Sequence, residues 1–213
     1  MHTVSKPAGL SVFPPHVEPD GDCVLARLLA ESPQAAAGPW PEGFAGGIAH
    51  RLDVGTSGAL AVADDPEELM ALRAAFQTKL LVKTYRFVAR RDVPWDEGGC
   101  DRAIAHDRRK KRRMVVQRGP STPHRGKWLP AETHFRRLGD GPYGMMWEAR
   151  MRTGVMHQIR VHAAFVGLVL AGDPIYGGGK PVPGGAPFAL HHVGFVGAGF
   201  ATGAVPEPVW AVS

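Results

Sequence analysis

A few polar side chains stand in otherwise apolar or glycine-rich segments and are of the types that perform acid–base and nucleophilic chemistry. Asp53 ends the segment GIAHRLD and precedes the turn residues VGTSG. Lys83 and Tyr85 are two residues apart in the strand-like LVKTYRF, so period-two geometry places an amine and a phenol on one face. Arg160 follows His157 by three residues in HQIRVH, a spacing that places both on one helix face. Taken singly, each residue is equally explained by a turn, by sheet packing or by a surface base.

Familiar catalytic and ligand-binding motifs do not fit these segments. GTSGA resembles the GxSxG turn of serine hydrolases, but Gly58 stands one residue too early for Ser57 to be the nucleophile. GDPIYGGGKP resembles a phosphate loop, yet Lys180 is followed by proline rather than Ser or Thr. His157 and His162 are five residues apart, which does not match the HExxH zinc motif. We therefore expect neither a metal nor a nucleotide cofactor.

The positive charge of the chain is concentrated in one segment. The 213 residues carry a formal net charge of +5, and six consecutive bases form the run Arg108–Arg113, which comprises Arg108, Arg109, Lys110, Lys111, Arg112 and Arg113. A solvated surface loop is the ordinary explanation of such a run. The apolar MVV that follows indicates a strand, which would hold the bases on a folded element and favours a polyanionic partner.

The length and the cysteine usage limit the class of protein. A chain of 213 residues buries roughly 70% of its unfolded surface, so one domain over residues 1–213 can form its own core. Cys23 and Cys100 form no CxxC pair, as expected of free thiols in a reducing compartment. We find neither a signal peptide nor a membrane span at the N-terminus or elsewhere, so we expect a soluble, cytoplasmic protein.

Strand patterns outnumber helix patterns and predict an α+β fold with a largely antiparallel mixed β-sheet flanked by helices and loops. The clearest helix is DDPEELMALRAAFQTKL, in which Asp65 is the N-cap and Glu68 completes a capping box, with an apolar stripe that ends at Leu80. Further helices are expected at residues 21–32 and 157–167. Strands are expected at residues 58–63, 81–90, 113–117, 131–138, 143–151, 188–195 and 208–212.

The order of these segments resembles the RluA-type RNA pseudouridine synthase family along nearly the whole chain. KPAGLSVFP, HRLDVGTSG, KTY, TGVMHQIRVH, GDPIYGG and LHH follow one another in this order. The HRLD and HQIRVH blocks are the specific signals. The resemblance implies the pseudouridine synthase fold and an enzyme that isomerises uridine to pseudouridine in rRNA or tRNA. It starts almost at the first residue, so we expect the catalytic domain alone, without an N-terminal S4-like domain.

The resemblance also implies roles for individual residues. Asp53 corresponds to the catalytic aspartate, Tyr85 to the tyrosine that stacks on the target base, and Arg160 to the arginine that pairs with the catalytic carboxylate. Leu190 corresponds to an apolar residue of the same pocket, and Arg51 lies beside the flipped nucleotide. The expected substrate contacts also include Lys83, His157 and the run Arg108–Arg113. Val155, Met156 and Gly55 depart from the family pattern, which predicts altered substrate contacts rather than lost chemistry.

The reaction implied by the resemblance suits these residue types. Breaking the bond between ribose and base creates positive charge at the anomeric carbon, which an ionised carboxylate stabilises, as in glycoside hydrolysis. An adjacent guanidinium favours the ionised form of Asp53. Whether Asp53 attacks the sugar, attacks the base or removes a sugar proton stays open. The reaction involves no redox change, so we expect no cofactor. The target uridine must be flipped out of its RNA.

Two other functions compete with this one. A catalytically inactive RNA-binding relative of the same fold is the first alternative, and the joint presence of Asp53, Tyr85 and Arg160 argues against it. A serine hydrolase that uses Ser57 is the second. RNA is the expected partner in the first two cases, and we expect a monomer without membrane association.

Overall fold

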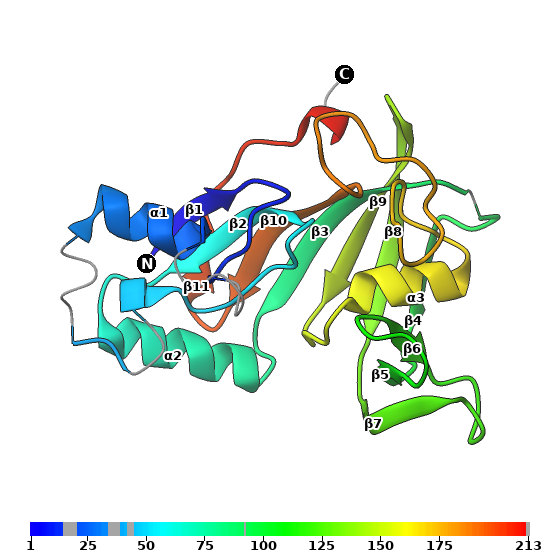
Figure 1. The fold of residues 1–213 in the computed structure, drawn as a ribbon, viewed down its shortest axis with the longest axis horizontal. Helices are drawn as coiled ribbons and strands as arrows, with labels where there is room; N and C mark the ends of the chain where they lie inside the picture. The colour runs from blue at the N-terminus through cyan, green and yellow to red at the C-terminus, as the bar shows by residue number, and fades with distance from the viewer. Residues whose placement is uncertain (15–20, 34–38, 42–44, 92, 212–213) are drawn as a thin grey trace. The chain divides into compact units, whose positions relative to one another are not determined.

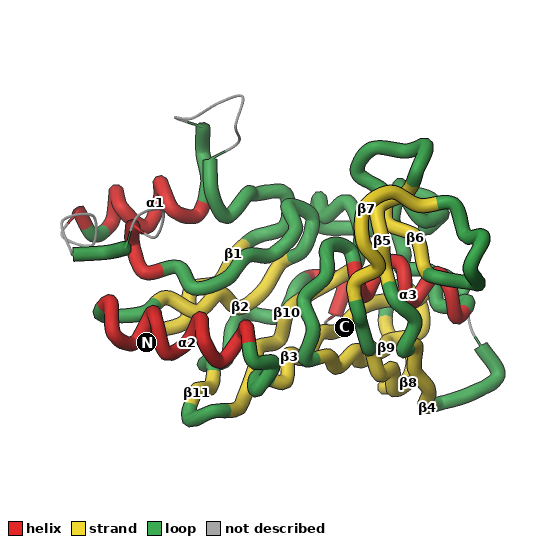
Figure 2. Tube along the Cα trace, turned by 90° about the horizontal axis from the view of Figure 1, so that it is seen from below, coloured by secondary structure: helices red, strands yellow, loops and turns green. Residues whose placement is uncertain are grey.

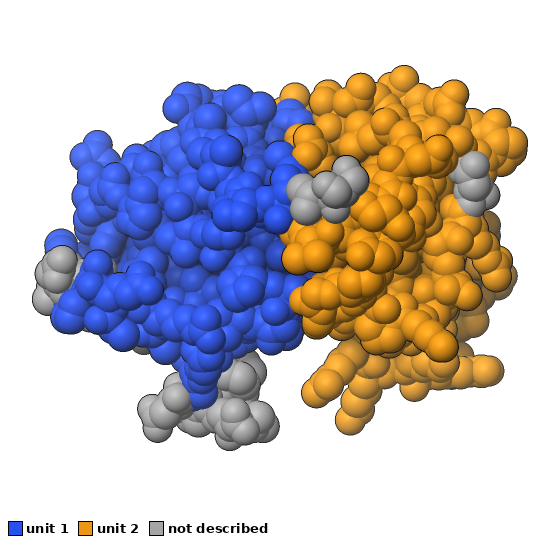
Figure 3. Space-filling model, turned by 90° about the horizontal axis from the view of Figure 1, so that it is seen from above, with its two compact units in different colours: residues 1–83, 191–207 blue, residues 84–190, 208–213 orange. Residues whose placement is uncertain are grey.

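The computed structural model describes residues 1–14, 21–33, 39–41, 45–91 and 93–211 (Figure 1). These residues form two compact units, coloured separately in Figure 3. Unit 1 consists of Met1–Lys83 and His191–Glu207, and unit 2 consists of Thr84–Leu190 and Pro208–Ser213. The chain thus leaves unit 1 near the start of one strand and returns to it near the start of another. The expected single domain over residues 1–213 stays a prediction.

Unit 1 is built around a buried strand. β2 (Ser57–Val62) is buried at all six positions, as its apolar sequence SGALAV requires. β1 (His2–Lys6) pairs with it antiparallel, and β10 (Leu190–Gly197) pairs with it in parallel through His191 and His192. The short β11 (Phe200–Ala201) returns antiparallel to β10. β2 follows Asp53 in the chain, so the residues after Asp53 enter the middle of this sheet, between β1 and β10.

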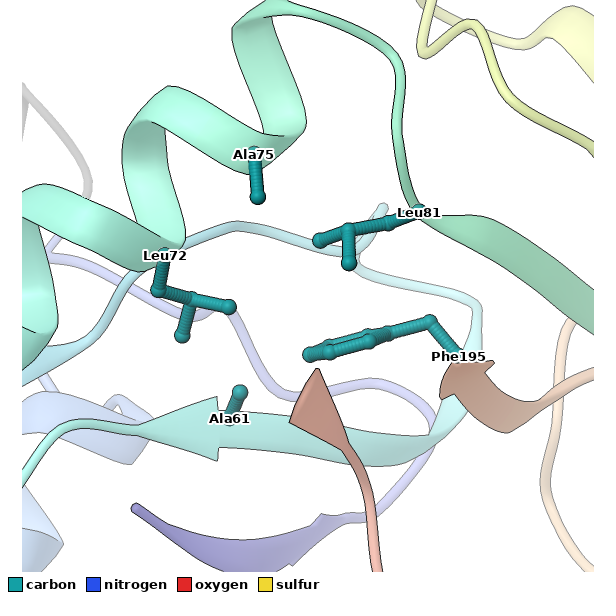
Figure 4. Close-up of a cluster of buried hydrophobic side chains, with 5 residues drawn as sticks. All are labelled: Ala61, Leu72, Ala75, Leu81 and Phe195. Carbon is teal, nitrogen blue, oxygen red and sulfur yellow. The ribbon is translucent and has the colours of Figure 1, made fainter. Parts of the chain in front are cut away.

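Helix α2 (Pro66–Gln77) covers one face of β2, as Figure 4 shows. Asp65 is its N-cap, as predicted, and the Asp65 carboxylate accepts from the Glu68 amide at 2.8 Å. The buried cluster between helix and sheet consists of Ala61, Leu72, Ala75, Leu81 and Phe195. The prediction that Leu80 continues the apolar stripe is wrong. The helix ends at Gln77, Lys79 adopts a φ of 59°, and Leu80 is left 54% exposed.

The other helical segments of unit 1 are short. α1 (Val24–Glu31) lies where residues 21–32 predicted a helix, and the Cys23 sulfur accepts from the Ala26 amide at its N-terminus. The 3₁₀ helix η2 (Ala45–Gly47) was not predicted. Its Gly46 and Gly47 have positive φ values, which lie outside the range that helix patterns describe.

Unit 2 contains two groups of strands. β3 (Val82–Ala89), β9 (Gly144–Met151), β8 (Thr133–Gly141) and β4 (Glu97–Cys100) lie in this order, and β8 is antiparallel to both β9 and β4. A separate three-stranded antiparallel sheet has the order β6 (Met114–Val116), β5 (Ile104–Asp107), β7 (His124–Leu129). Helix α3 (Gln158–Val166) contacts β4, β6 and β8 and so joins the two groups (Figures 1 and 2).

The architecture confirms the α+β class and the largely antiparallel mixed sheet. The strands expected near residues 58–63, 81–90, 113–117, 131–138, 143–151 and 188–195 are all present, with shifted ends. The strand expected at 208–212 is wrong, because Val209–Ala211 is a 3₁₀ helix, η3, with Trp210 buried, while residue 212 lies outside the described residues. No helix among the described residues has the length and apolar character needed to span a membrane.

Candidate active site

Asp53 lies in a tight turn that leads into the central strand of unit 1. The Asp53 carbonyl accepts from the Thr56 amide at 3.0 Å, which closes a turn over Val54 and Gly55. Leu52 is 5% exposed and anchors the turn in the core, whereas Asp53 is half-buried and Arg51 is exposed. The turn therefore presents the carboxylate at the boundary between the core and the solvent.

Lys6, at the end of β1, is the principal support of this turn. Its ammonium group donates to the carbonyls of Pro7 at 2.9 Å, Val54 at 3.1 Å and Thr56 at 2.6 Å. Only 1% of Lys6 is exposed. Burial lowers the pKa of Lys6 to about 8, while the negative charge of Asp53 opposes this shift. Lys6 thus fixes both sides of the turn and places a positive charge near Asp53.

The titration of Lys6 predicts an alkaline loss of activity. An ammonium group has three N–H donors for these three carbonyls, and a neutral amine has only two. We expect kcat/KM of a reaction that uses the Asp53 turn to fall as pH rises through about 8. The unfolded chain keeps this proton up to about 10.5, so by linkage the Lys6 contribution to stability rises with pH between these values. Unfolding caused by Lys6 therefore cannot produce the fall.

A pH–rate profile from pH 6 to 10 checks this expectation. Lys6→Met should have lower activity at neutral pH and no alkaline decline. Lys83→Met is the matched control, because burial also lowers the pKa of Lys83 to about 8 although Lys83 makes no contact with the turn carbonyls. Loss of the alkaline decline in Lys83→Met, with its retention in Lys6→Met, would contradict the assignment.

The residues after the turn belong to the sheet. Ser57 starts β2, is 9% exposed, and its hydroxyl lies 2.9 Å from Nδ1 of His191 on β10. Gly58 has a φ of 122°, and a Cβ at this position would collide with the backbone of His192. Both residues therefore allow β10 to approach β2 closely, so TSG has a structural role.

Lys83 lies in a buried group of rings in unit 1. It is 7% exposed, and its amine is 5.8 Å from the centre of the Phe76 ring. The rings of His50 and His192 are 5.7 Å apart, and burial lowers the pKa of both, that of His192 to about 4. Both imidazoles are therefore neutral at pH 7, and Nε2 of His50 accepts from the Ala61 amide.

Tyr85 and Leu190 belong to unit 2. Tyr85 lies on β3 just after the chain enters this unit, and Leu190 is the first residue of β10, just before the chain leaves it. The burial pattern of β3 alternates at its start, and Lys83, Tyr85 and Phe87 are its buried positions there. This confirms the predicted shared face of Lys83 and Tyr85. Tyr85 is 7% exposed and Leu190 is 4% exposed. Both side chains are thus held by packing, and their expected contacts with the base stay predictions.

Arg160 forms a buried ion pair with Asp173. Arg160 Nε lies 2.7 Å from Oδ2 of Asp173, and Nη2 lies 2.9 Å from Oδ1. Arg160 is 4% exposed and Asp173 is 0% exposed. Asp173 Oδ1 also accepts from the amides of Ile175 and Tyr176. This pair uses two of the five guanidinium donors and fixes the plane of the group. The expected pairing of Arg160 with Asp53 stays a prediction.

Aromatic rings hold the same guanidinium. Its carbon lies 4.2 Å from the centre of the Phe188 ring and 5.4 Å from that of Tyr176. The Tyr176 hydroxyl accepts from the Met114 amide at 2.9 Å and lies 3.2 Å from Nδ1 of His157. Burial raises the pKa of Tyr176 to about 12, so the hydroxyl stays protonated. Tyr176 therefore links the Arg160 site to the start of β6.

His157 does not share a helix face with Arg160, contrary to the prediction. It is the N-cap of α3 and adopts a left-handed conformation with a φ of 57°, so helical spacing does not apply to it. The two side chains nevertheless converge, because both contact Tyr176. His157 and Arg160 are thus connected through Tyr176, which lies outside the helix.

The basic run forms the hairpin loop between β5 and β6. Residues 108–112 are exposed and Arg113 is half-buried. The Asp107 carboxylate accepts from the amides of Arg109 and Lys110, and the Asp107 amide donates to the carbonyl of Arg113, which closes the loop. The bases thus lie in an exposed surface loop, the ordinary explanation of such a run, and the predicted folded element is present only as the strands β5 and β6 that flank it. Their expected contact with phosphates stays a prediction.

Comparison with known proteins identifies the family. The family model described as RNA pseudouridylate synthase matches residues 1–165. The chain belongs to this family. One relative is an uncharacterized RNA pseudouridine synthase of Chloroflexus aurantiacus, which is 37% identical over 174 residues, 81% of this chain and 51% of the relative. The resemblance found in the sequence is thereby confirmed.

Other relatives in the RNA pseudouridylate synthase family bear more specific names. The ribosomal large subunit pseudouridine synthase D of Nitrosomonas europaea is 35% identical, with 84% of this chain and 48% of the relative covered. That of Escherichia coli K12 is 34% identical, with 88% and 53% covered. The chain spans about half the length of these curated relatives. Human RNA Pseudouridylate Synthase Domain Containing 1 shares the fold, with a TM-score of 0.73, 21% identity, and 97% and 79% coverage.

Three residues of the site were not predicted from the sequence. Asp173 and Tyr176 lie in GDPIYGG, a segment that fails as a phosphate loop and belongs to the family resemblance, but neither residue was expected in the site. A turn signal in the sequence could have indicated them. An aspartate often accepts from the amides of the residues two and three positions later, as Asp173 does from Ile175 and Tyr176. Lys6 lies in KPAGLSVFP, and a single lysine before proline gives no sign of burial.

No metal site accompanies these residues in the described part of the chain. There, no three His, Cys, Asp or Glu side chains are grouped so that they could hold an ion. Cys23 and Cys100 are both buried free thiols.

Proposed function

We propose that this chain isomerises uridine to pseudouridine in structured RNA, with Asp53 as the catalytic carboxylate. The observation that carries this proposal is the family match over residues 1–165, which contains Asp53, Tyr85 and Arg160 together. The turn supports it, since it presents Asp53 at the core boundary and is held by the buried Lys6. The bidentate support of Arg160 by Asp173 gives the second charged group a fixed orientation.

The proposed reaction assigns one task to each group. The bond from the anomeric carbon to N1 of uracil breaks, and a bond from the same carbon to C5 forms. The proton on C5 leaves and N1 gains a proton, so atoms and charge balance without a redox partner. The Asp53 carboxylate stabilises the positive charge at the anomeric carbon. Tyr85 stacks on the detached base and takes part in removal of the C5 proton, and Arg160 favours the ionised carboxylate.

The proposed substrate is ribosomal RNA, with tRNA as the competing substrate. Two of the relatives described above are named for the large ribosomal subunit, which favours rRNA. Incubation with large-subunit rRNA and with tRNA, each tritiated at C5 of uridine, tests the proposal through tritium release. Release from rRNA alone supports it fully, and release from tRNA alone redirects the substrate. No release from either RNA supports the inactive RNA-binding relative instead.

The proposal also includes a monomer that acts in the cytoplasm and needs no cofactor. Light scattering of the purified chain, with and without RNA, tests the monomer. Activity after exhaustive dialysis against a chelator tests the absence of a cofactor.

Ser57 is not expected to act as a hydrolase nucleophile. Its hydroxyl contacts His191, as in a catalytic pair, but both residues are buried, at 9% and 2% exposure, inside the parallel pairing of β2 and β10. We expect no labelling by a fluorophosphonate probe. Ser57→Ala should keep tritium release within about threefold of wild type, because a scaffold hydrogen bond contributes only about 1 kcal/mol. Labelling that disappears in Ser57→Ala would support the hydrolase.

The basic loop is expected to supply affinity that depends on salt. Lys110→Gln combined with Lys111→Gln removes two exposed charges. If both contact phosphates, the slope of log K against log salt concentration should fall by about 1.4 to 1.8, since each contact contributes about 0.7 to 0.9. Fluorescence anisotropy with labelled rRNA measures the slope. Arg27→Gln with Lys79→Gln removes two exposed charges of unit 1 and is the control, which should leave the slope unchanged.

A further inference from the structure

A cavity of about 300 Å³ in unit 2 contains two cations and an aromatic side chain. The end of β3, the segment around Ala171, the loop after Gly178 and the turn before β9 form its walls. Arg90, Lys180 and Tyr143 are its functional side chains, and no acidic residue lines it. We propose that this cavity binds a backbone phosphate of the RNA substrate, at a place separate from the basic loop. The inference rests on the proposed function and extends it to a second anchoring site.

The two cations are available to a ligand. Arg90 and Lys180 are exposed, and neither side chain forms an ion pair or a hydrogen bond with the residues that the structure describes. Many other arginines in unit 2 are engaged: Arg136 with Glu148, Arg137 with Asp96, and Arg160 with Asp173. Two unengaged positive charges on one concave surface attract an anion, and phosphate matches the fork of an arginine.

Arg90 is held in place by the fold. Its amide donates to the carbonyl of Val169 at 2.7 Å, and the Ala171 amide donates to that of Val88 at 2.8 Å, which ties the end of β3 to the cavity wall. Gly179 has a φ of 77°, and a Cβ at this position would collide with the Arg90 guanidinium. The guanidinium therefore lies against the bare backbone of Gly179. A group positioned in this way loses little freedom when an anion binds.

The size of the cavity favours part of a nucleotide chain over a large cofactor. A volume of about 300 Å³ is at the lower end of the range of roughly 300–1,000 Å³ for small-molecule sites. Pro181 and Pro183 stiffen one wall, and Tyr143, 46% exposed, offers a hydroxyl and a ring face. A phosphate between the cations with its ribose against Tyr143 would fill this space.

The location of the cavity fits an extended RNA. Arg90 lies five residues beyond Tyr85, so along the strand direction the two are roughly 17 Å apart at about 3.3 Å per residue. A phosphate held at Arg90 would therefore belong to a nucleotide several positions from the uridine that Tyr85 contacts. In Figure 1 the cavity segments lie on the other side of α3 from the β5–β6–β7 sheet with its basic loop. The two cationic sites would thus hold different parts of the same RNA.

Charge removal within the cavity tests the proposal. The variants are Arg90→Gln, Lys180→Gln and both together, and Arg91→Gln is the matched control, because Arg91 is the next residue, is exposed and does not line the cavity. The probe is a fluorescein-labelled fragment of large-subunit rRNA, and binding is measured by anisotropy over a range of salt concentrations. Arg90→Gln should weaken binding about tenfold, as expected for one charge-assisted contact. The salt slope should fall by about 0.7 to 0.9.

Tritium release separates this proposal from the proposed function. We expect the double variant to raise KM and to keep kcat within about twofold of wild type, since the cavity does not touch the reacting base. The anisotropy measurement needs no catalysis, so it stands even if the wild type releases no tritium. Binding and salt slope equal to those of wild type and of Arg91→Gln would overturn the proposal. Competition by uridine monophosphate with no effect of the variants on RNA binding would also overturn it, in favour of a free nucleotide site.

Discussion

Replacing Asp53 with asparagine is expected to lower the rate of tritium release from uridine-labelled RNA by about 10²–10³-fold, the scale of loss when a group that stabilises transition-state charge is removed. Asparagine has almost the same shape as aspartate, so the turn closed by the Asp53 carbonyl and the Thr56 amide is retained. The change therefore removes the negative charge without removing the loop. The loss should appear in kcat, because the carboxylate acts on charge that develops only during the reaction.

RNA binding by Asp53→Asn should stay within about threefold of wild type, because phosphate contacts elsewhere supply most of the affinity. Asp22→Asn is a suitable control, since Asp22 is an exposed aspartate that pairs with Arg27 on the surface of unit 1. Tritium release by Asp53→Asn at the wild-type rate would remove Asp53 from the mechanism. Loss of RNA binding together with activity would instead assign Asp53 to substrate contact.

Replacing Asp173 with asparagine is expected to lower the free energy of unfolding by about 3–5 kcal/mol, the usual cost of leaving a buried charge without its partner. Arg160 is 4% exposed, so water cannot replace the missing carboxylate. The side chain of asparagine can still accept from the amides of Ile175 and Tyr176. The change in the free energy of unfolding therefore measures the contribution of the negative charge on Asp173 and not that of the turn. Urea denaturation followed by circular dichroism measures it.

Asp107 provides a matched control for this measurement. Its carboxylate also accepts from the amides two and three residues later, Arg109 and Lys110, and lies 3.8 Å from an arginine, Arg113. The Asp107 side chain is 17% exposed, whereas that of Asp173 is fully buried. Asp107→Asn should cost no more than about 1 kcal/mol. Equal losses in the two variants would show that burial of the Arg160–Asp173 pair is not decisive.

Local signals made the framework of the site predictable. The N-cap and proline of α2 and the apolar run of β2 depend on neighbouring residues, so the sequence pattern contains them. The turn after Asp53 is indicated by the local residues VGTSG, although Lys6 supports it from a distant part of the chain. Short strands such as β4, with the sequence EGGC, and β7, with HRGKWL, carry glycines and charges and are held by pairing with distant strands. No local pattern marks them.

Partners distant in sequence could not be predicted from these patterns. Lys6 contacts carbonyls 48 and 50 residues away, and backbone carbonyls carry no sequence signal. Tyr176 contacts Met114 through an amide 62 residues away. The Arg160–Asp173 pair spans only 13 residues, but several other carboxylates are equally available to an arginine in the sequence. Asp173 is the carboxylate that is buried next to Arg160, and which residues are buried depends on the complete fold.

The close approach of β10 to Gly58 affects how other sequences of this family should be interpreted. A side chain at this position would collide with the backbone of His192. The glycine is thus required for the fold of unit 1 whether or not the chain is an enzyme. A relative without a carboxylate at position 53 would still need the glycine of TSG. The TSG motif therefore indicates a shared fold and not catalytic activity. Under the proposed function, the carboxylate at position 53 is instead the group expected to separate an enzyme from an inactive descendant.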